Sequence, residues 1–219
     1  MINYSYLFAG SVILFTGLAT GYVLGYGIAR KNARSFQNSG EALVRSELQA
    51  NFSAPDFHLL NHITLKLGDS TTQIDHILVS RFGVFVIETK DYSGWIFANA
   101  KHSTWTQVTY SGKFKFQNPI FQNLRHLQAV QELLDFLPPS AIKSVVVFVG
   151  SAEFKTEVPA EVFSLSGLME YIRNHSEEAL SLNRVQFSVG RIETARLAVS
   201  GQTDLEHLQN LERRHGHRK

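Results

Sequence analysis

Two consecutive apolar runs near the middle of the chain carry charged residues at one end. Residues 74–80 read Ile-Asp-His-Ile-Leu-Val-Ser, and residues 84–90 read Val-Phe-Val-Ile-Glu-Thr-Lys. The short connection between them contains a glycine and predicts a β-hairpin, with Asp75 and Glu88 roughly opposite each other near its open end. Buried charge is costly unless a partner compensates it, and a divalent cation would be such a partner.

Side chains alternate along a strand, so the second run is expected to place its charged residues on one face. Glu88 and Lys90 would share that face with Val84 and Val86, while Phe85 and Ile87 would lie on the other. A structural alternative is an ion pair between Glu88 and Lys90 at a sheet edge, with Asp75 capping a turn. The pattern by itself leaves both interpretations open.

The arrangement resembles the PD-(D/E)xK nuclease core, and more closely its nuclease-related domain (NERD) branch. The similar segments are Gly40-Glu41, Gln73 to Ile77, Gly83 to Lys90, Tyr92 to Gly94, Trp105, and Asn118 to Asn123. They follow the order of the family over about half of the chain, from Gly40 to Val149. No proline precedes Asp75, a departure from the superfamily name at a position that varies among such nucleases.

The resemblance implies an α/β, restriction-endonuclease-like domain with a mixed central sheet flanked by helices. It also implies hydrolysis of phosphodiester bonds in nucleic acid, with DNA favoured over RNA. Asp75, Glu88 and the backbone carbonyl of Thr89 would hold Mg²⁺, or Mn²⁺ in its place, through hard oxygen ligands. Lys90 would orient the attacking water and stabilise charge on the phosphate.

Two further residues are assigned to the site by the resemblance alone. Glu41 follows a capping position, where a carboxylate also suits the helix dipole, and the resemblance places it beside the metal. Gln122 is either a site residue or a solvated glutamine. The cations expected to contact the phosphate backbone without reading sequence are Lys101, Lys113, Lys115 and Arg125. His76 would point away from Asp75 and serve core packing.

The first residues predict a membrane anchor. No charged residue occurs from Ile2 to Ala29, a span long enough to cross a bilayer as a helix. Arg30, Lys31 and Arg34 follow it and place the remaining chain in the cytoplasm. A cleaved signal peptide is the competing interpretation, but the apolar stretch is too long and no small-residue cleavage site follows.

Gly17, Gly21 and Gly25 recur at every fourth position and would line one face of that helix. Such a face allows a second helix to approach closely and would support a homo-oligomer. The alternative is the ordinary tolerance of membrane helices for glycine.

The expected organisation is an anchor (1–30), a linker (31–39), a nuclease-like core (40–150) and an α/β completion with a helical basic tail (151–219). The domain is expected to open on a helix capped by Ser39 or Gly40. The further expected elements are a strand at 63–67, a hairpin joining 95–97 to 108–110, a helix from the Asn118 cap to Pro138, a central strand at 144–149, a strand at 162–164, a helix at 167–175 capped by Ser166, and a helical region at 182–211 with a break at 200–201.

Composition excludes several other functions. The chain has no cysteine, so disulfides, thiolate metal sites and cysteine nucleophiles are absent. No P-loop and no Gly-x-Ser-x-Gly elbow occurs, and His215 with His217 makes an incomplete zinc set. A net charge of +2 is too small to indicate nucleic-acid binding by itself. The rival hypothesis is a catalytically inactive, membrane-tethered module that binds nucleic acid or acts as a scaffold.

Overall fold

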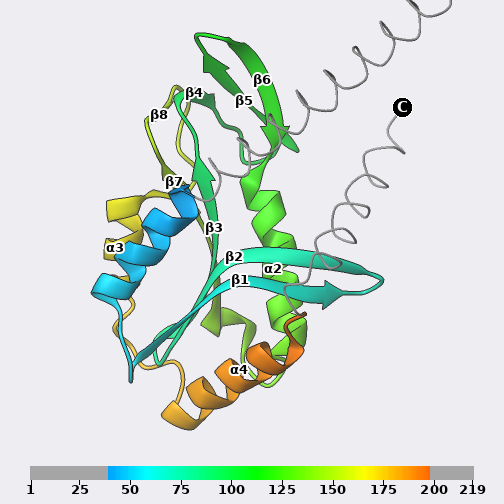
Figure 1. The fold of residues 1–219 in the computed structure, drawn as a ribbon, viewed down its shortest axis with the longest axis vertical. Helices are drawn as coiled ribbons and strands as arrows, with labels where there is room; N and C mark the ends of the chain where they lie inside the picture. Colours follow the sequence, from blue (N-terminus) through cyan, green and yellow to red (C-terminus); the bar gives the residue numbers. More distant parts are fainter. Residues whose placement is uncertain (1–38, 198–219) are drawn as a thin grey trace, which may run out of the picture. The chain divides into compact units, whose positions relative to one another are not determined.

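The structure is a computed structural model that describes residues 39–197 (Figure 1). The predicted anchor, its glycine face, nearly all of the linker and the basic tail lie outside the described residues. Within the described range, no helix is both long and apolar enough to cross a membrane. The described residues from Gly40 onward belong to one compact unit.

A five-stranded mixed sheet forms the centre of this unit, in the order β1-β2-β3-β7-β9. The antiparallel strands are β1 (Phe57–Leu67), β2 (Ser70–Ser80) and β3 (Gly83–Asp91). The strands β7 (Ile142–Val149) and β9 (Val162–Ser164) run parallel to β3. β3 and most of β7 are buried on both faces, as their continuous apolar runs predict.

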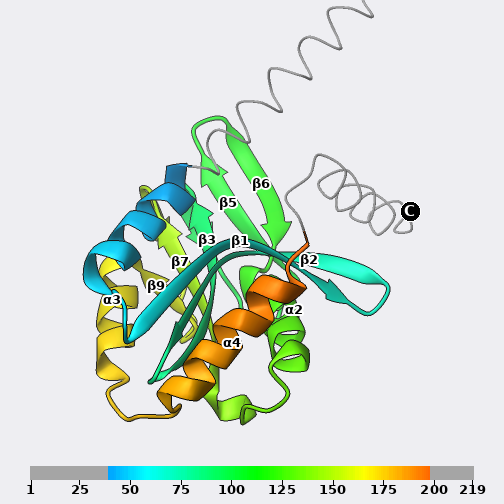
Figure 2. The same cartoon turned by 60° about the horizontal axis from the view of Figure 1, so that its bottom comes forward.

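Helices cover both faces of this sheet (Figures 1 and 2). The helix of residues 39–51 and α3 (Leu165–Asn174) pack on the face that carries Phe85 and Ile87. The other face carries Val84 and Val86, and α2 (Pro119–Leu133) and α4 (Leu182–Ala195) pack there. The predicted alternation of β3 and the mixed α/β architecture are both confirmed.

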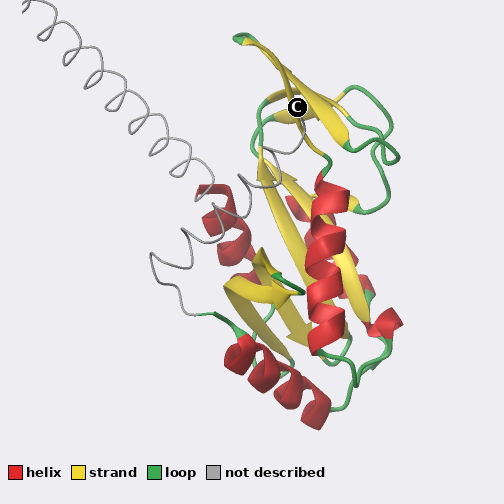
Figure 3. Ribbon diagram, turned by 90° about the vertical axis from the view of Figure 1, so that its right-hand side faces the viewer, coloured by secondary structure: helices red, strands yellow, loops and turns green. Residues whose placement is uncertain are grey.

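A second, four-stranded sheet has the order β6-β5-β4-β8 (Figure 3). Its strands are β4 (Gly94–Phe97), β5 (Thr104–Thr109), β6 (Gly112–Gln117) and β8 (Ala152–Phe154). The predicted hairpin is present, since Trp95 lies opposite Val108. One face of the sheet packs Ile96 and Trp105 against Phe148 of β7. This sheet therefore continues the core beyond the end of β3.

Several predicted boundaries differ from the structure. β1 begins earlier, at Phe57, and α2 ends at Leu133, where Leu134 leaves helical geometry although its side chain stays buried. A 3₁₀ turn (Pro139–Ala141) then leads into β7.

The two C-terminal helices also differ from their predicted bounds. α3 begins at Leu165 because Ser164, not Ser166, caps it by accepting the Gly167 amide. α4 ends at Ala195, because Arg196 is extended and Leu197 donates to the Thr64 carbonyl of β1. The predicted break at residues 200–201 lies outside the described residues.

Candidate active site

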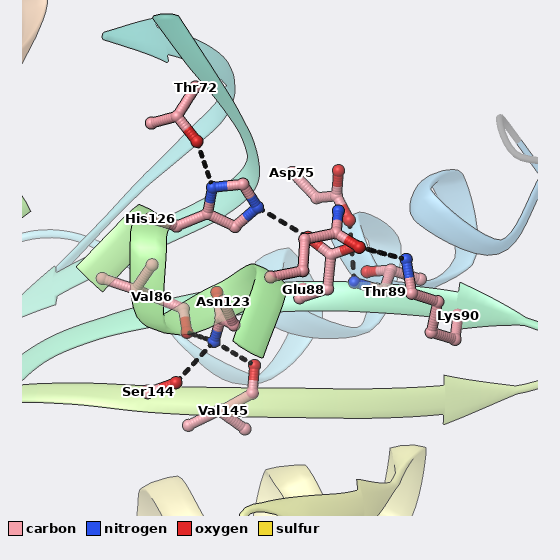
Figure 4. Close-up of polar contacts among 11 residues, drawn as sticks. Thr72, Asp75, Val86, Glu88, Thr89, Lys90, Asn123, His126, Ser144 and Val145 are labelled. Carbon is pink, nitrogen blue, oxygen red and sulfur yellow. Dashed lines mark hydrogen bonds and ion pairs between the residues drawn. The ribbon is translucent and has the colours of Figure 1, made fainter. Parts of the chain in front are cut away.

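The strands β2 and β3 stop pairing at the position of the first acid. Their ladder ends at His76 opposite Ile87. Asp75, the residue before His76, does not continue the backbone pairing. Its side-chain Oδ2 accepts the Thr89 amide at 2.7 Å. The carboxylate of Asp75 thus replaces a backbone acceptor and is directed toward the second half of β3 (Figure 4).

Glu88 lies on the face of β3 that α2 covers, and its side chain is only 2 % exposed. Lys90 Nζ donates to Oε1 at 2.5 Å, and His126 Nε2 lies 3.0 Å from Oε2 (Figure 4). Since a carboxylate can only accept, Nε2 is the protonated nitrogen of that contact. Burial would raise the pKa of Glu88, but Lys90 and His126 together lower it. Glu88 is therefore a buried, ionised carboxylate.

Lys90 completes this network. Its ammonium also donates to Gln122 Oε1 at 3.1 Å. Burial would lower the pKa of Lys90, yet the neighbouring Glu88 carboxylate outweighs it and raises the pKa. The ion pair of the structural alternative thus exists, but it lies inside the domain instead of at an exposed edge, and Asp75 caps no turn.

The charge of Glu88 affects the pKa values of two more carboxylates, Glu41 and Asp75. Burial raises the pKa of Glu41 to about 7, and repulsion from Glu88 adds to it. Burial likewise raises the pKa of Asp75 well above its usual range, with further repulsion from Glu88 and Glu41. His62 Nδ1 lies 3.3 Å from Glu41 Oε2. Three acids from three elements therefore lie close enough that Glu88 adds to the raised pKa of both Glu41 and Asp75.

α2 holds this arrangement from the side. Asn118 caps the helix by accepting the Ile120 amide, and its own amide bonds to the loop after β4, most closely to the His102 carbonyl at 2.8 Å. One turn later, the Asn123 amide donates to the Val86 carbonyl at 2.9 Å and to the Val145 carbonyl at 3.0 Å. Because those carbonyls belong to β3 and β7, Asn123 fixes α2 across both strands (Figure 4).

His126 and Asn123 were not predicted as site residues. His126 joins Glu88 to Thr72 of β2, whose Oγ1 lies 2.6 Å from Nδ1. The available signal for His126 was its spacing of four residues from Gln122, since residues three or four apart share one face of a helix. Asn123 lies three residues before His126. Gln122 itself does contact Lys90, as the site interpretation of that residue requires.

The donor set suits a hard cation. Within the part of the chain that the structure describes, no group of three or more His, Cys, Asp or Glu side chains is arranged to hold a metal ion. Asp75, Glu41 and Glu88 nevertheless supply oxygen donors, the type that Mg²⁺ prefers. Each oxygen of Glu88 keeps a second lone pair beyond its present hydrogen bond. A cation would also relieve the repulsion that raises the pKa values of Asp75 and Glu41.

The lysines predicted to bind the phosphate backbone are not part of the hydrogen-bond network of the carboxylates. Lys113 and Lys115 are exposed on β6 of the second sheet, and Lys101 is exposed in the loop after β4. Arg125 is half-buried on α2. His76 serves packing, as expected: it is buried, and burial lowers its pKa to about 3.

Comparison with known proteins identifies the family of this chain. Residues 37–149, more than half of the 219, match the nuclease-related domain family. An uncharacterised protein of Bacillus anthracis is 41% identical over 99 residues, which are 44% of this chain and 46% of that protein. The chain thus spans about half the length of this relative. No solved structure matches significantly. Since the family match covers the whole candidate site, the chain belongs to the nuclease-related domain (NERD) family.

Proposed function

We propose that the chain is a metal-dependent nuclease that hydrolyses phosphodiester bonds of DNA, or of RNA, at the site of Asp75, Glu88 and Lys90. Membership of the NERD family supports a nuclease-related function. The observation that carries the proposal is the convergence of the Glu41, Asp75 and Glu88 carboxylates beside the buried Lys90 ammonium. Such a concentration of shifted ionisable groups is costly for folding and is typical of catalytic sites.

Asp75 and Glu88, with the Thr89 backbone carbonyl, would hold Mg²⁺ or Mn²⁺, and Glu41 would add a further oxygen ligand. When bound, the ion would supply positive charge that polarises a phosphate oxygen and lowers the pKa of a water molecule.

Lys90 acts as a fixed positive charge. Its raised pKa keeps the ammonium protonated, so it is a poor base but a good hydrogen-bond donor to a phosphate oxygen. Gln122 and Glu88 hold the ammonium from two sides and limit its rotation. His126 is a positioning residue, because it acts on the carboxylate of Glu88 through a hydrogen bond.

We also propose that the protein is a single-pass membrane protein with the domain in the cytoplasm. The uncharged span from Ile2 to Ala29 and the cations that follow it support this topology. The glycine face of residues 17, 21 and 25 would then allow the anchor to self-associate.

The test is cleavage by the full-length chain, purified in mild detergent, of single-stranded, duplex and branched DNA and of RNA. We expect cleavage with Mg²⁺ or Mn²⁺ and none with EDTA. Asp75→Ala and Glu88→Ala should abolish cleavage, and Lys90→Ala should lower kcat by about 100-fold or more while the metal still binds. Glu170→Gln, an exposed change on α3, is the matched control.

The scaffold alternative is favoured by one observation. Both oxygens of Glu88 already accept hydrogen bonds, from Lys90 and His126, so this carboxylate has protein partners that could serve a purely structural role. A chain that binds nucleic acid but cleaves no substrate of the panel with either metal would make this alternative the better account.

A further inference from the structure

The second sheet has one face in the core and one face open. Ile96, Gln107 and Phe154 lie side by side in its ladder, and two of them, Ile96 and Phe154, pack with the core. Because neighbouring strand residues alternate, Trp95 and Phe97 of β4 must lie on the opposite face. Their side chains are 49% and 40% exposed. Two large aromatic side chains on one strand thus face away from the core.

Lysines accompany these aromatic side chains on the same face. In one row of the ladder Trp95 lies opposite Val108, which lies opposite Lys113. In the next row Phe97 lies opposite Thr106, which lies opposite Lys115. The open face therefore carries an aromatic strand beside a basic strand.

The other edge of the face is also basic. Lys155 follows β8, and its Nζ lies 4.9 Å from the centre of the Trp95 ring. It forms an ion pair with Glu153, which lies beside Trp95 in the ladder. Lysines 113, 115 and 155 outnumber this single glutamate, so the face around the aromatic side chains carries net positive charge.

We propose that this open face, defined by Trp95, Phe97, Lys113, Lys115 and Lys155, binds single-stranded nucleic acid. Bases would stack on Trp95 and Phe97, and the lysines on both sides would contact the phosphates. Stacking aromatic side chains within a basic surface are the general means by which proteins hold single strands. A duplex keeps its bases stacked on each other and cannot use the aromatic side chains in this way.

The exposed cation–π contact of Lys155 is weaker than the stacking of a base, so a base can displace that ammonium from the Trp95 ring. Trp95 follows Lys90 by five residues, which limits the separation of their Cα atoms to about 17 Å. A nucleic-acid strand that stacks on Trp95 would therefore be bound near the carboxylate site. The inference rests on the proposed function only in taking nucleic acid as the ligand.

Binding is measured with the full-length chain in EDTA, so that cleavage does not enter. The probe is oligothymidylate of about 15 nucleotides, near the upper site size of a stacking domain. An abasic strand of equal length and a duplex of equal length are the comparators. We expect the single strand to bind at least about tenfold more tightly than the abasic strand, because only the former can stack.

Tryptophan fluorescence gives a local readout, since the chain has two tryptophans and Trp105 is 1% exposed with its indole nitrogen bonded to the Asn99 carbonyl. Oligothymidylate should quench the fluorescence of Trp95. Trp95→Phe should lose that quenching and keep most of the affinity. Trp95→Ala should weaken binding about tenfold. Phe187→Ala, which removes a 53% exposed aromatic side chain from α4, is the matched control and should bind as wild type does.

Equal affinity for the abasic strand and oligothymidylate would overturn the proposal, as would affinity of Trp95→Ala within about twofold of wild type. These outcomes are distinct from failure of the nuclease proposal. A chain that binds oligothymidylate through Trp95 but cleaves nothing with Mg²⁺ keeps the stacking face and loses the nuclease. A chain that cleaves but binds without stacking does the reverse.

Discussion

Glu88 accepts hydrogen bonds from Lys90 and His126 in a position that water hardly reaches. A buried carboxylate of this kind is tolerated because both oxygens have charged or polar donors. The consequence is that each donor contributes to stability as well as to the geometry of the site. Removing one donor leaves a buried charge with too few partners.

We expect His126→Ala to lower the free energy of unfolding by about 3 kcal/mol, because hydrogen bonds to buried charges are among the stronger ones. Thr72→Val should cost less, since it removes only the contact to the far nitrogen of the ring. Urea denaturation of both variants measures the difference. If His126→Ala were as stable as wild type, the bond between His126 and Glu88 would not be a structural constraint.

The pKa of Glu41 makes the metal-free domain sensitive to pH. A carboxyl whose pKa is raised on folding, here from 4.5 to about 7, contributes stability below the lower value and loses it as pH rises to the upper one. Relative to Glu41→Gln, wild type in EDTA should therefore become less stable between pH 4.5 and about 7. Thermal unfolding of both proteins across that range measures the effect.

Added Mg²⁺ should reverse this trend in wild type, because an ionised Glu41 then gains a cation beside it. Glu170→Gln serves as the control for loss of an acid elsewhere and should follow wild type. A pH profile of Glu41→Gln that coincides with wild type would contradict the raised pKa of Glu41.

At the residue scale, the sequence contains the acid, acid and lysine pattern, but it does not show which neighbours determine the ionisation of these side chains. Asp75, Glu88 and Lys90 lie near each other in a predictable hairpin, so their proximity follows from strand geometry. Glu41 and His126 come from helices distant in sequence. The hydrogen bond from His126 to Glu88 and the electrostatic effect of Glu88 on Glu41 depend on how those helices dock on the sheet, which no local pattern encodes.

At the scale of elements, α2 is the part that fixes the site. Its apolar residues Ala129 and Val130 pack against the sheet, and its polar residues reach the acid and the lysine. Asn118 joins its first turn to the loop after β4 through the His102 carbonyl. A loss of that cap should therefore affect stability and the site together.

Asn118→Ser and Asn118→Ala separate the two roles of this side chain. Serine keeps an oxygen that accepts an amide of the first turn and loses the bonds to the loop, whereas alanine loses both. We expect alanine to be less stable than serine by about 1 kcal/mol, the usual contribution of an N-cap. Both should reduce cleavage, because both loosen the loop. Equal stability of the two variants, measured by urea denaturation, would show that the cap itself contributes little.

The elements that the sequence predicts well are those with long apolar runs. β3 and β7 are continuous and buried, so composition alone identifies them. β6 and β8 are short and largely exposed or half-buried, so neither has the long buried apolar run by which β3 and β7 are recognised. Ser164 and Ser166 are both competent caps by type, and only the backbone geometry selects Ser164.

At the scale of the whole molecule, the domain carries its proposed chemistry and its proposed binding surface on connected elements. β3 carries Lys90 one residue before its end at Asp91, and β4 with Trp95 follows after two residues. The loop after β4 is bonded to Asn118, the cap of α2. Single-stranded nucleic acid bound to the second sheet would thus contact a sheet that is joined to α2, the helix whose side chains hold Glu88 and Lys90.

The remaining prediction concerns how the domain is placed in the cell, which depends on residues outside the described range. The uncharged span to Ala29 is followed by Arg30, Lys31 and Arg34, and such cations remain on the cytoplasmic side of the membrane. A reporter fused after Lys219 should therefore be active only in the cytoplasm. Replacing the three cations with glutamine should weaken this orientation, and replacing Arg196 with glutamine, far from the span in sequence, should leave it unchanged. Reporter activity outside the cytoplasm, or a mature chain that begins after residue 29, would contradict the anchored topology.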